Sequence, residues 1–105
     1  MLRVSYSSQE WAMRCSRIEV AQEWIGPIEA QALIQVIADL EALQNVADAI
    51  DFLDAEIDDA GNIKVPVSRK RIALLRSVPI VAEKQLAGIN WSQVRRLQLF
   101  DIVEI

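Results

Sequence analysis

Histidine is absent from the 105-residue chain, and cysteine occurs only once, at Cys15. Without histidine, the chain cannot build the Cys–His sites of zinc fingers or the Ser–His and Cys–His pairs of hydrolases. A single cysteine cannot form an internal disulfide, which indicates a reducing compartment. We therefore expect a cytoplasmic protein.

Long apolar runs are also missing. No segment approaches the roughly 18 consecutive apolar residues that cross a bilayer. The first residues, MLRVSYSSQEW, lack the apolar core of a signal peptide. We therefore expect no association with a membrane. Hydrophobic residues at 52% and charged residues at 25% are typical of a globular protein, and the length predicts one domain over residues 1–105.

Charge is distributed unevenly along the chain. Residues 1–63 contain three cations and 12 acidic residues, a net charge of −9, whereas residues 64–105 contain eight cations and three acidic residues, a net charge of +5. A basic C-terminal half could bind nucleic acid or an acidic protein. Alternatively, the two halves neutralise each other within the fold.

Helix signals dominate the first half. The segments starting at Ser7 and Ser16 both match the capping box, in which a Ser hydroxyl and a Glu three residues later bind free N–H groups. Gly26-Pro27 is typical of one helix ending and the next beginning. Apolar residues then recur every three or four positions from Pro27 to about Gln44, which predicts a long helix lying on a sheet.

Strand signals dominate the second half, and the residues around Leu2–Tyr6 predict one further strand. We expect a hairpin from Phe52–Ile57 and Ile63–Val67, then strands over Arg71–Val78 and Val94–Ile105, with a short turn at Trp91 capped by Asn90 and a connector over residues 81–88. This order predicts an α+β fold, with an N-terminal strand and helices packed on a mostly antiparallel twisted sheet.

An acidic run, Asp51, Asp54, Glu56, Asp58 and Asp59, has carboxylates near a glycine, as calcium loops do. The spacing does not fit, because Gly61 is eighth from Asp54 where an EF-hand needs its glycine sixth. We therefore expect a solvated hairpin and neither a metal nor a cofactor.

The segment VPVSRKRIALLRS places four cations, Arg69, Lys70, Arg71 and Arg76, along one predicted strand. Arg95 and Arg96 lie on the last strand, which could neighbour it. Guanidinium groups that converge on a sheet would bind phosphate and stabilise charge that develops on it. The alternative is a solvated strand end whose cations meet the acidic residues of the first half.

Three segments resemble the RelE/ParE toxin superfamily, in particular the HigB-like plasmid-maintenance killer proteins. The run WIGPIEAQALIQVIADLEALQNVADAIDF is similar to the family's long helix and the stretch "aeNLaDL" after it. RIALL resembles the strand "yRLiF", and LAGINWSQVRRLQLFDIVEI resembles the closing segment that ends "IxDYH".

The resemblance implies the toxin half of a toxin–antitoxin pair with a helix-turn-helix antitoxin. RelE- and HigB-like members cut mRNA on the ribosome without a metal, whereas ParE-like members inhibit DNA gyrase. Arg71 falls on the family's strand arginine and Glu104 on its terminal aspartate, so both would be catalytic. Five other cations would bind RNA: Arg69, Lys70, Arg76, Arg95 and Arg96.

The chain departs from the family pattern at its end. Ile105 stands where the family has tyrosine, and the terminal histidine has no counterpart. Loss of a general acid or base costs roughly 10²- to 10⁴-fold in rate. The favoured hypothesis is a ribosome-dependent mRNA endonuclease. The alternatives are a non-catalytic protein of the same fold that binds an antitoxin or gyrase, and a stand-alone structural domain.

Overall fold

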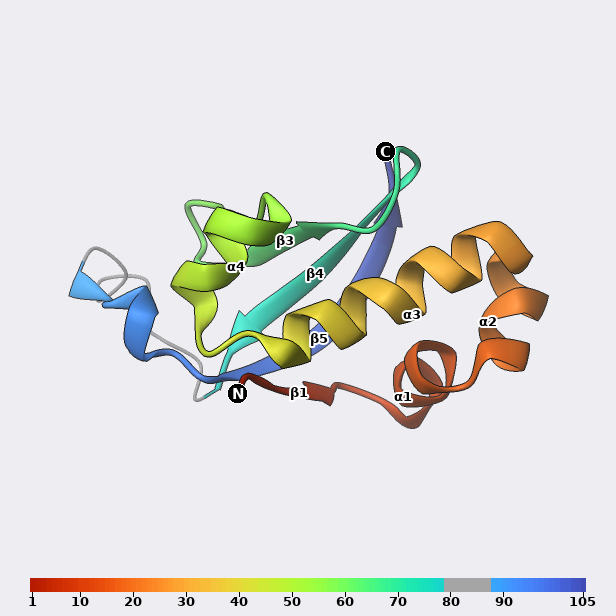
Figure 1. Cartoon of the computed structure of the whole chain (residues 1–105), viewed down its shortest axis with the longest axis horizontal. Helices are drawn as coiled ribbons and strands as arrows, with labels where there is room; N and C mark the ends of the chain where they lie inside the picture. Colours follow the sequence, from red (N-terminus) through yellow and green to blue (C-terminus); the bar gives the residue numbers. More distant parts are fainter. Residues whose placement is uncertain (79–87) are drawn as a thin grey trace.

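The computed structural model describes residues 1–78 and 88–105. Within them the elements follow one another as β1 (Arg3–Tyr6), α1 (Gln9–Ser16), α2 (Ile18–Ile25), α3 (Pro27–Ala42), α4 (Val46–Leu53), β2 (Glu56–Ile57), β3 (Ile63–Pro66), β4 (Arg71–Ser77), η2 (Trp91–Gln93) and β5 (Arg96–Glu104). The fold is therefore α+β, as the sequence predicts (Figure 1). None of these helices has the length and apolar character needed to cross a bilayer.

The five strands form one mixed sheet in the order β1-β5-β4-β3-β2. Neighbouring strands are antiparallel except β1, which pairs with β5 in parallel. The last strand in the sequence thus lies inside the sheet and connects the first strand to the rest. A register shift at Leu74/Leu75 leaves Phe100 of β5 without a direct partner on β4, as in a β-bulge.

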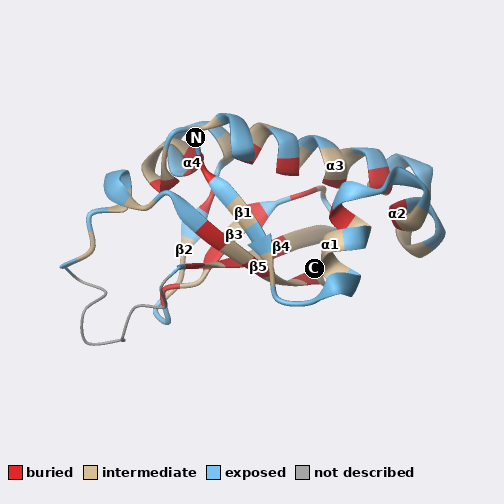
Figure 2. Ribbon diagram, turned by 90° about the horizontal axis from the view of Figure 1, so that it is seen from below, coloured by how far each residue is buried: buried red, intermediate tan, exposed pale blue. Residues whose placement is uncertain are grey.

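The helices lie on one face of this sheet, with α3 running along it (Figures 1 and 2). The core forms between the two layers. Its members are apolar residues of low exposure, among them Leu33, Ile37 and Leu40 of α3, Val46 and Ala49 of α4, and Ile63, Val65, Leu75, Leu97 and Leu99 of the strands. Because side chains alternate along a strand, the residues between them point to the opposite face.

We call that opposite face the open face, since no helix of the described residues covers it (Figure 2). The strand registers assign the following side chains to it: Arg3 and Ser5 of β1, Arg96, Gln98, Asp101 and Val103 of β5, Ile72, Leu74 and Arg76 of β4, Lys64 and Pro66 of β3, and Glu56 of β2. Four of these twelve residues are cationic and two are acidic, so the open face has a net positive charge.

The junction between α2 and α3 agrees with its prediction. Gly26 ends α2 with a φ of 84°, a left-handed region that glycine adopts without strain, and Pro27 begins α3. The short turn is also confirmed, because the Asn90 side chain accepts a hydrogen bond from the Ser92 N–H at the start of η2.

Three predictions need correction. Residues 52 and 53 belong to α4 and not to a strand, so the hairpin begins only at Glu56. The first capping residue is Ser8, which accepts from the Trp11 N–H, and α2 begins at Ile18 after Arg17, whose side chain makes no capping hydrogen bond. Ser16 instead donates to the Ala12 carbonyl.

The basic segment is not a single strand either. Arg69 and Lys70 lie in the turn between β3 and β4, because Val67 and Ser68 both donate to the Arg71 carbonyl and close a tight hairpin there. The connector expected over residues 81–88 lies outside the described residues except for Gly88, and so does Pro79, which follows the predicted end of the strand at Val78.

Candidate functional site

Arg71 begins β4 and points to the helix-covered side of the sheet, the side that Ala73 and Leu75 share. Its guanidinium contacts two carboxylates. Nη1 lies 2.8 Å from Glu29 Oε1, and Nη2 lies 3.2 Å from Glu104 Oε1. The Arg71 side chain is only 14% exposed, so these contacts are partly shielded from water.

Glu29 lies in the first turn of α3, where Gly26 and Pro27 fix the start of the helix. Its Oε1 also accepts a hydrogen bond of 2.6 Å from the Ser68 hydroxyl. The Ser68 hydrogen bond, followed by Arg71, lowers the pKa of Glu29 below its ordinary value, against the opposing effect of burial. Glu29 is therefore a stable anion that holds Arg71 in place.

Of the two carboxylates that contact Arg71, Glu104 is the exposed one. It faces Arg71 directly across the β4–β5 ladder, and its side chain is 78% exposed. The β3–β4 turn closes the same end of the sheet, because the Ile105 N–H donates to the Lys70 carbonyl at 2.8 Å. We call Ser68, Arg71, Glu29 and Glu104 the Arg71 cluster. Arg69 and Lys70 stand exposed beside it.

Arg76 and Arg96 are not part of this cluster. Arg76 lies on the open face, where its Nε donates to Gln98 Oε1 at 2.8 Å and its guanidinium lies 4.9 Å from the centre of the Phe100 ring. Arg96 lies at the far end of β5 from Glu104. Arg95 precedes β5, and its carbonyl accepts from the Arg3 N–H.

The structure thus divides the predicted site residues into two groups. Arg69, Lys70, Arg71 and Glu104 gather at one end of the sheet, with Arg71 turned toward the helices. Arg76 and Arg96 lie toward the other end, on the open face. One short RNA segment could follow Arg69 and Lys70, but it would have to cross the sheet to reach Arg96.

Three further residues contact or adjoin these two groups, and no sequence motif had marked them as site residues. Glu29 is an ordinary helix residue in the sequence and Ser68 an ordinary turn residue, and Glu29 meets Ser68 and Arg71 only because α3 crosses the end of β4. Arg3 comes beside Arg96 through the parallel pairing of β1 with β5. A partner 39 or more positions away leaves no periodic pattern that could reveal it.

Other reactive side chains are less suited to chemistry. Burial raises the pKa of the Cys15 thiol to about 12, although Arg14 acts against it. Burial also raises the pKa of Tyr6, which packs toward the core on β1. Neither group is ready to exchange a proton at neutral pH. No cluster of metal-ligating residues occurs among residues 1–78 and 88–105.

The Arg71 cluster can therefore do one kind of chemistry. It presents a guanidinium of fixed position next to an exposed carboxylate, a combination that can hold a phosphate and accept a proton from a nearby hydroxyl.

Comparisons with models of protein families, with curated proteins and with solved structures found no match to this chain.

Proposed function

We propose that this chain is the toxin of a toxin–antitoxin module and that it cleaves mRNA on the ribosome without a metal. The observation that supports this function is the contact between Arg71 and the exposed Glu104, 3.2 Å apart. The resemblance to the RelE/ParE superfamily assigns a catalytic role to these same two positions.

The reaction uses two groups of this cluster together with a proton from solvent. The 2′-hydroxyl of a nucleotide attacks its own 3′-phosphate, and the bond from phosphorus to the 5′-oxygen of the next nucleotide breaks. Glu104 accepts the proton of the 2′-hydroxyl, and Arg71 stabilises the negative charge that develops on the phosphate. Solvent supplies the proton to the leaving 5′-oxygen. The products are a 2′,3′-cyclic phosphate and a 5′-hydroxyl.

The residues around the cluster fit an RNA substrate. Arg69 and Lys70 are exposed in the adjacent turn and would bind the phosphates on either side of the cleaved bond. Arg76, Arg95 and Arg96 would contact more distant nucleotides. A helix-turn-helix antitoxin with an acidic segment would neutralise the same cations and block access to the RNA.

A second function is favoured by a different observation. Both amino groups of Arg71 already contact carboxylates, from Glu29 and from Glu104. A guanidinium in two ion pairs must exchange one of them before it can bind a phosphate. This favours a non-catalytic protein of the same fold that binds an antitoxin or DNA gyrase through its exposed cations.

The test is cell-free translation with the purified protein, followed by mapping of the 5′ ends of the mRNA. Glu104→Gln removes the proton acceptor at an exposed position, so the fold should survive. We expect new cuts inside codons with the wild type and a loss of roughly 10²-fold or more with Glu104→Gln. Arg71→Lys keeps the charge but loses the planar fork and should also be strongly impaired.

The matched control is Arg17→Ala, which removes an exposed cation between α1 and α2. It should cut mRNA like the wild type, and circular dichroism should show that all variants are folded. Equal cutting by Glu104→Gln would remove the catalytic role of Glu104. Intact mRNA with the wild type would favour the binding function, and a supercoiling assay with gyrase would then be decisive.

A further inference from the structure

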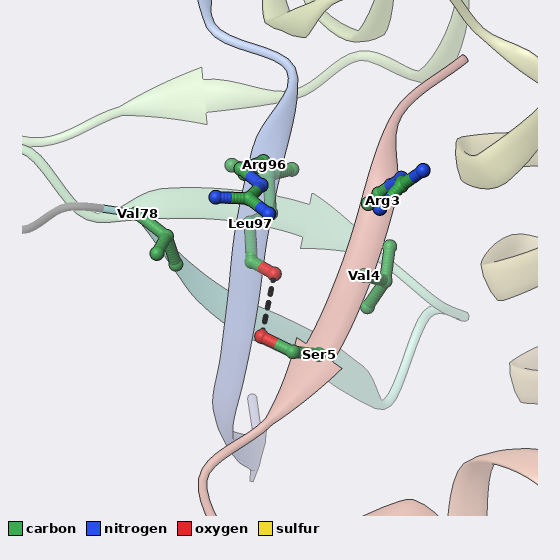
Figure 3. A pocket seen from close by; sticks show the side chains of 6 residues that line it. All are labelled: Arg3, Val4, Ser5, Val78, Arg96 and Leu97. Carbon is green, nitrogen blue, oxygen red and sulfur yellow. Dashed lines mark hydrogen bonds between the residues drawn. The ribbon is translucent and has the colours of Figure 1, made fainter.

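Two arginines lie side by side where the first and last strands pair. Arg3 of β1 and Arg96 of β5 are direct partners in the parallel register, and both are exposed. Adjacent strands are about 4.8 Å apart, so the two side chains leave the sheet close together on its open face. A hollow of about 380 Å³ lies at this position, lined by Arg3, Val4, Ser5, Val78, Arg96 and Leu97 (Figure 3).

Without a ligand, the pairing of Arg3 with Arg96 destabilises the sheet. Like charges directly opposite each other on neighbouring strands destabilise a sheet. In Figure 3 the two guanidinium groups point away from each other, as repulsion would favour. No ion pair joins Arg3 or Arg96 to an acidic residue within residues 1–78 and 88–105. Glu41 lines a neighbouring hollow together with Arg3, but the two side chains are not within ion-pair distance.

The surroundings add positive potential and apolar surface. In the next row of the open face, Gln98 fixes Arg76 by a hydrogen bond of 2.8 Å, and the guanidinium stacks on Phe100. The Ser5 hydroxyl donates to the Leu97 carbonyl at 3.1 Å and so holds β1 against β5. Val78 forms an apolar wall and is 38% exposed. Two arginines beside an apolar wall can hold a phosphate whose organic group lies on the wall.

We infer that Arg3 and Arg96 form a phosphate-binding site. Two planar guanidinium groups can each donate two hydrogen bonds to phosphate oxygens, and the dianion removes the repulsion between them. The phosphate could belong to a free nucleotide or to a nucleic acid chain. The site lies on the opposite face of the sheet from the Arg71 cluster, so phosphate binding there does not require the cleavage chemistry, although it shares Arg96 with the proposed contacts to distant nucleotides of the RNA.

The experiment is an NMR titration of the full chain at low salt, following the amide signals of Val4, Ser5 and Leu97. The probes are inorganic phosphate, a nucleoside 5′-monophosphate, the unphosphorylated nucleoside, and an eight-nucleotide single-stranded RNA with and without a 5′-phosphate. We expect saturable shifts with phosphate and with the monophosphate, and none with the nucleoside. If the 5′-phosphate of the RNA strengthens binding at least tenfold, the site takes terminal phosphates. Equal binding of both RNAs would assign it to phosphodiesters.

Arg3→Gln and Arg96→Gln should each weaken phosphate binding at least tenfold, whereas Arg17→Gln should leave it unchanged. A second readout separates a binding role from a structural one. Phosphate should raise the melting temperature of the wild type but not of Arg3→Gln, and Arg3→Gln without phosphate should melt no lower than the wild type. The inference is overturned if the wild type shows no saturable shift, if the Gln variants bind equally well, or if Arg3→Gln melts clearly lower.

Discussion

At the scale of single residues, Glu29 determines what Arg71 can do. Its carboxylate accepts from Ser68 and from Arg71 at 2.6 and 2.8 Å, and both contacts lower its pKa. A group whose pKa is lower in the folded state than in the unfolded state stabilises the fold only above its unfolded pKa. The stabilisation from Glu29 is therefore present at neutral pH and is lost as the pH falls below about 4 toward the lowered value.

This predicts a pH-dependent effect of Glu29→Gln. The variant should melt at a lower temperature than the wild type at pH 7, because Arg71 loses its charged partner. The difference should shrink as the pH is lowered from 7 toward 3, because the stabilisation from the ionised carboxyl is lost as the pH falls through its lowered pKa. Thermal melts followed by circular dichroism at both pH values measure it. Glu23→Gln, an exposed glutamate on α2, is the control and should show no such convergence. A gap of equal size at both pH values would contradict the role of the charge.

At the scale of elements, α4 depends on Asn45, the cap residue that precedes it. The Asn45 side chain accepts a hydrogen bond of 3.0 Å from the Asp48 N–H, and Asp48 in turn accepts from the Gln44 N–H at 3.3 Å. The first bond satisfies a donor that the start of the helix otherwise leaves unpaired, and the second ties the preceding residue to the first turn. Val46 and Ala49 then pack in the core with no exposed surface.

Asn45→Ala should lower the free energy of unfolding by about 1 kcal/mol, because it removes the cap. Asn45→Ser keeps an oxygen that can accept the same hydrogen bond and should recover most of the loss. Urea titrations of the three proteins at one pH provide the comparison. If the Ala and Ser variants lost the same stability, the cap would not be the cause.

The same helix shows what the sequence could and could not predict. Asn45 followed by Val46, Ala49 and Leu53 is a capped helical pattern, but residues 52–57 also fit an extended segment, and that interpretation was wrong for residues 52 and 53. The long helix α3 was predictable because its period repeats over 16 residues between clear boundaries. The contacts of Arg71 and Arg3 were not, because they depend on how α3 crosses the sheet and on which strand β1 joins.

At the scale of the whole molecule, the two oppositely charged halves meet at few points. Among the described residues, the Glu29–Arg71 pair alone joins an acidic residue of the first half to a cation of the second. Mutual neutralisation therefore accounts for little of the basic charge on the open face. The cations Arg3 and Arg96 on this face therefore stay open to solvent, as the proposed phosphate site requires.

Cohesion between the layers comes instead from the core, in which Leu99 of the interior strand β5 is completely buried. Leu99→Ala should lower the free energy of unfolding by roughly 2–5 kcal/mol. Val103→Ala, on the open face of the same strand, should cost clearly less. Urea unfolding followed by tryptophan fluorescence and by circular dichroism measures both. If the unfolding curves from the two probes coincide, they support the predicted single domain over residues 1–105. A smaller loss of unfolding free energy for Leu99→Ala than for Val103→Ala would contradict the assignment of faces.

The position of β5 has a further consequence for the order in which the molecule assembles. The hydrogen bond from Ser5 to Leu97 joins residues 92 positions apart. During synthesis, β1 and the apolar side of α3 emerge long before the strand that must lie beside them. Closing so long a loop is entropically costly, and a fold with many such contacts forms slowly. The N-terminal half should therefore remain exposed to chaperones and proteases until the ribosome has released β5.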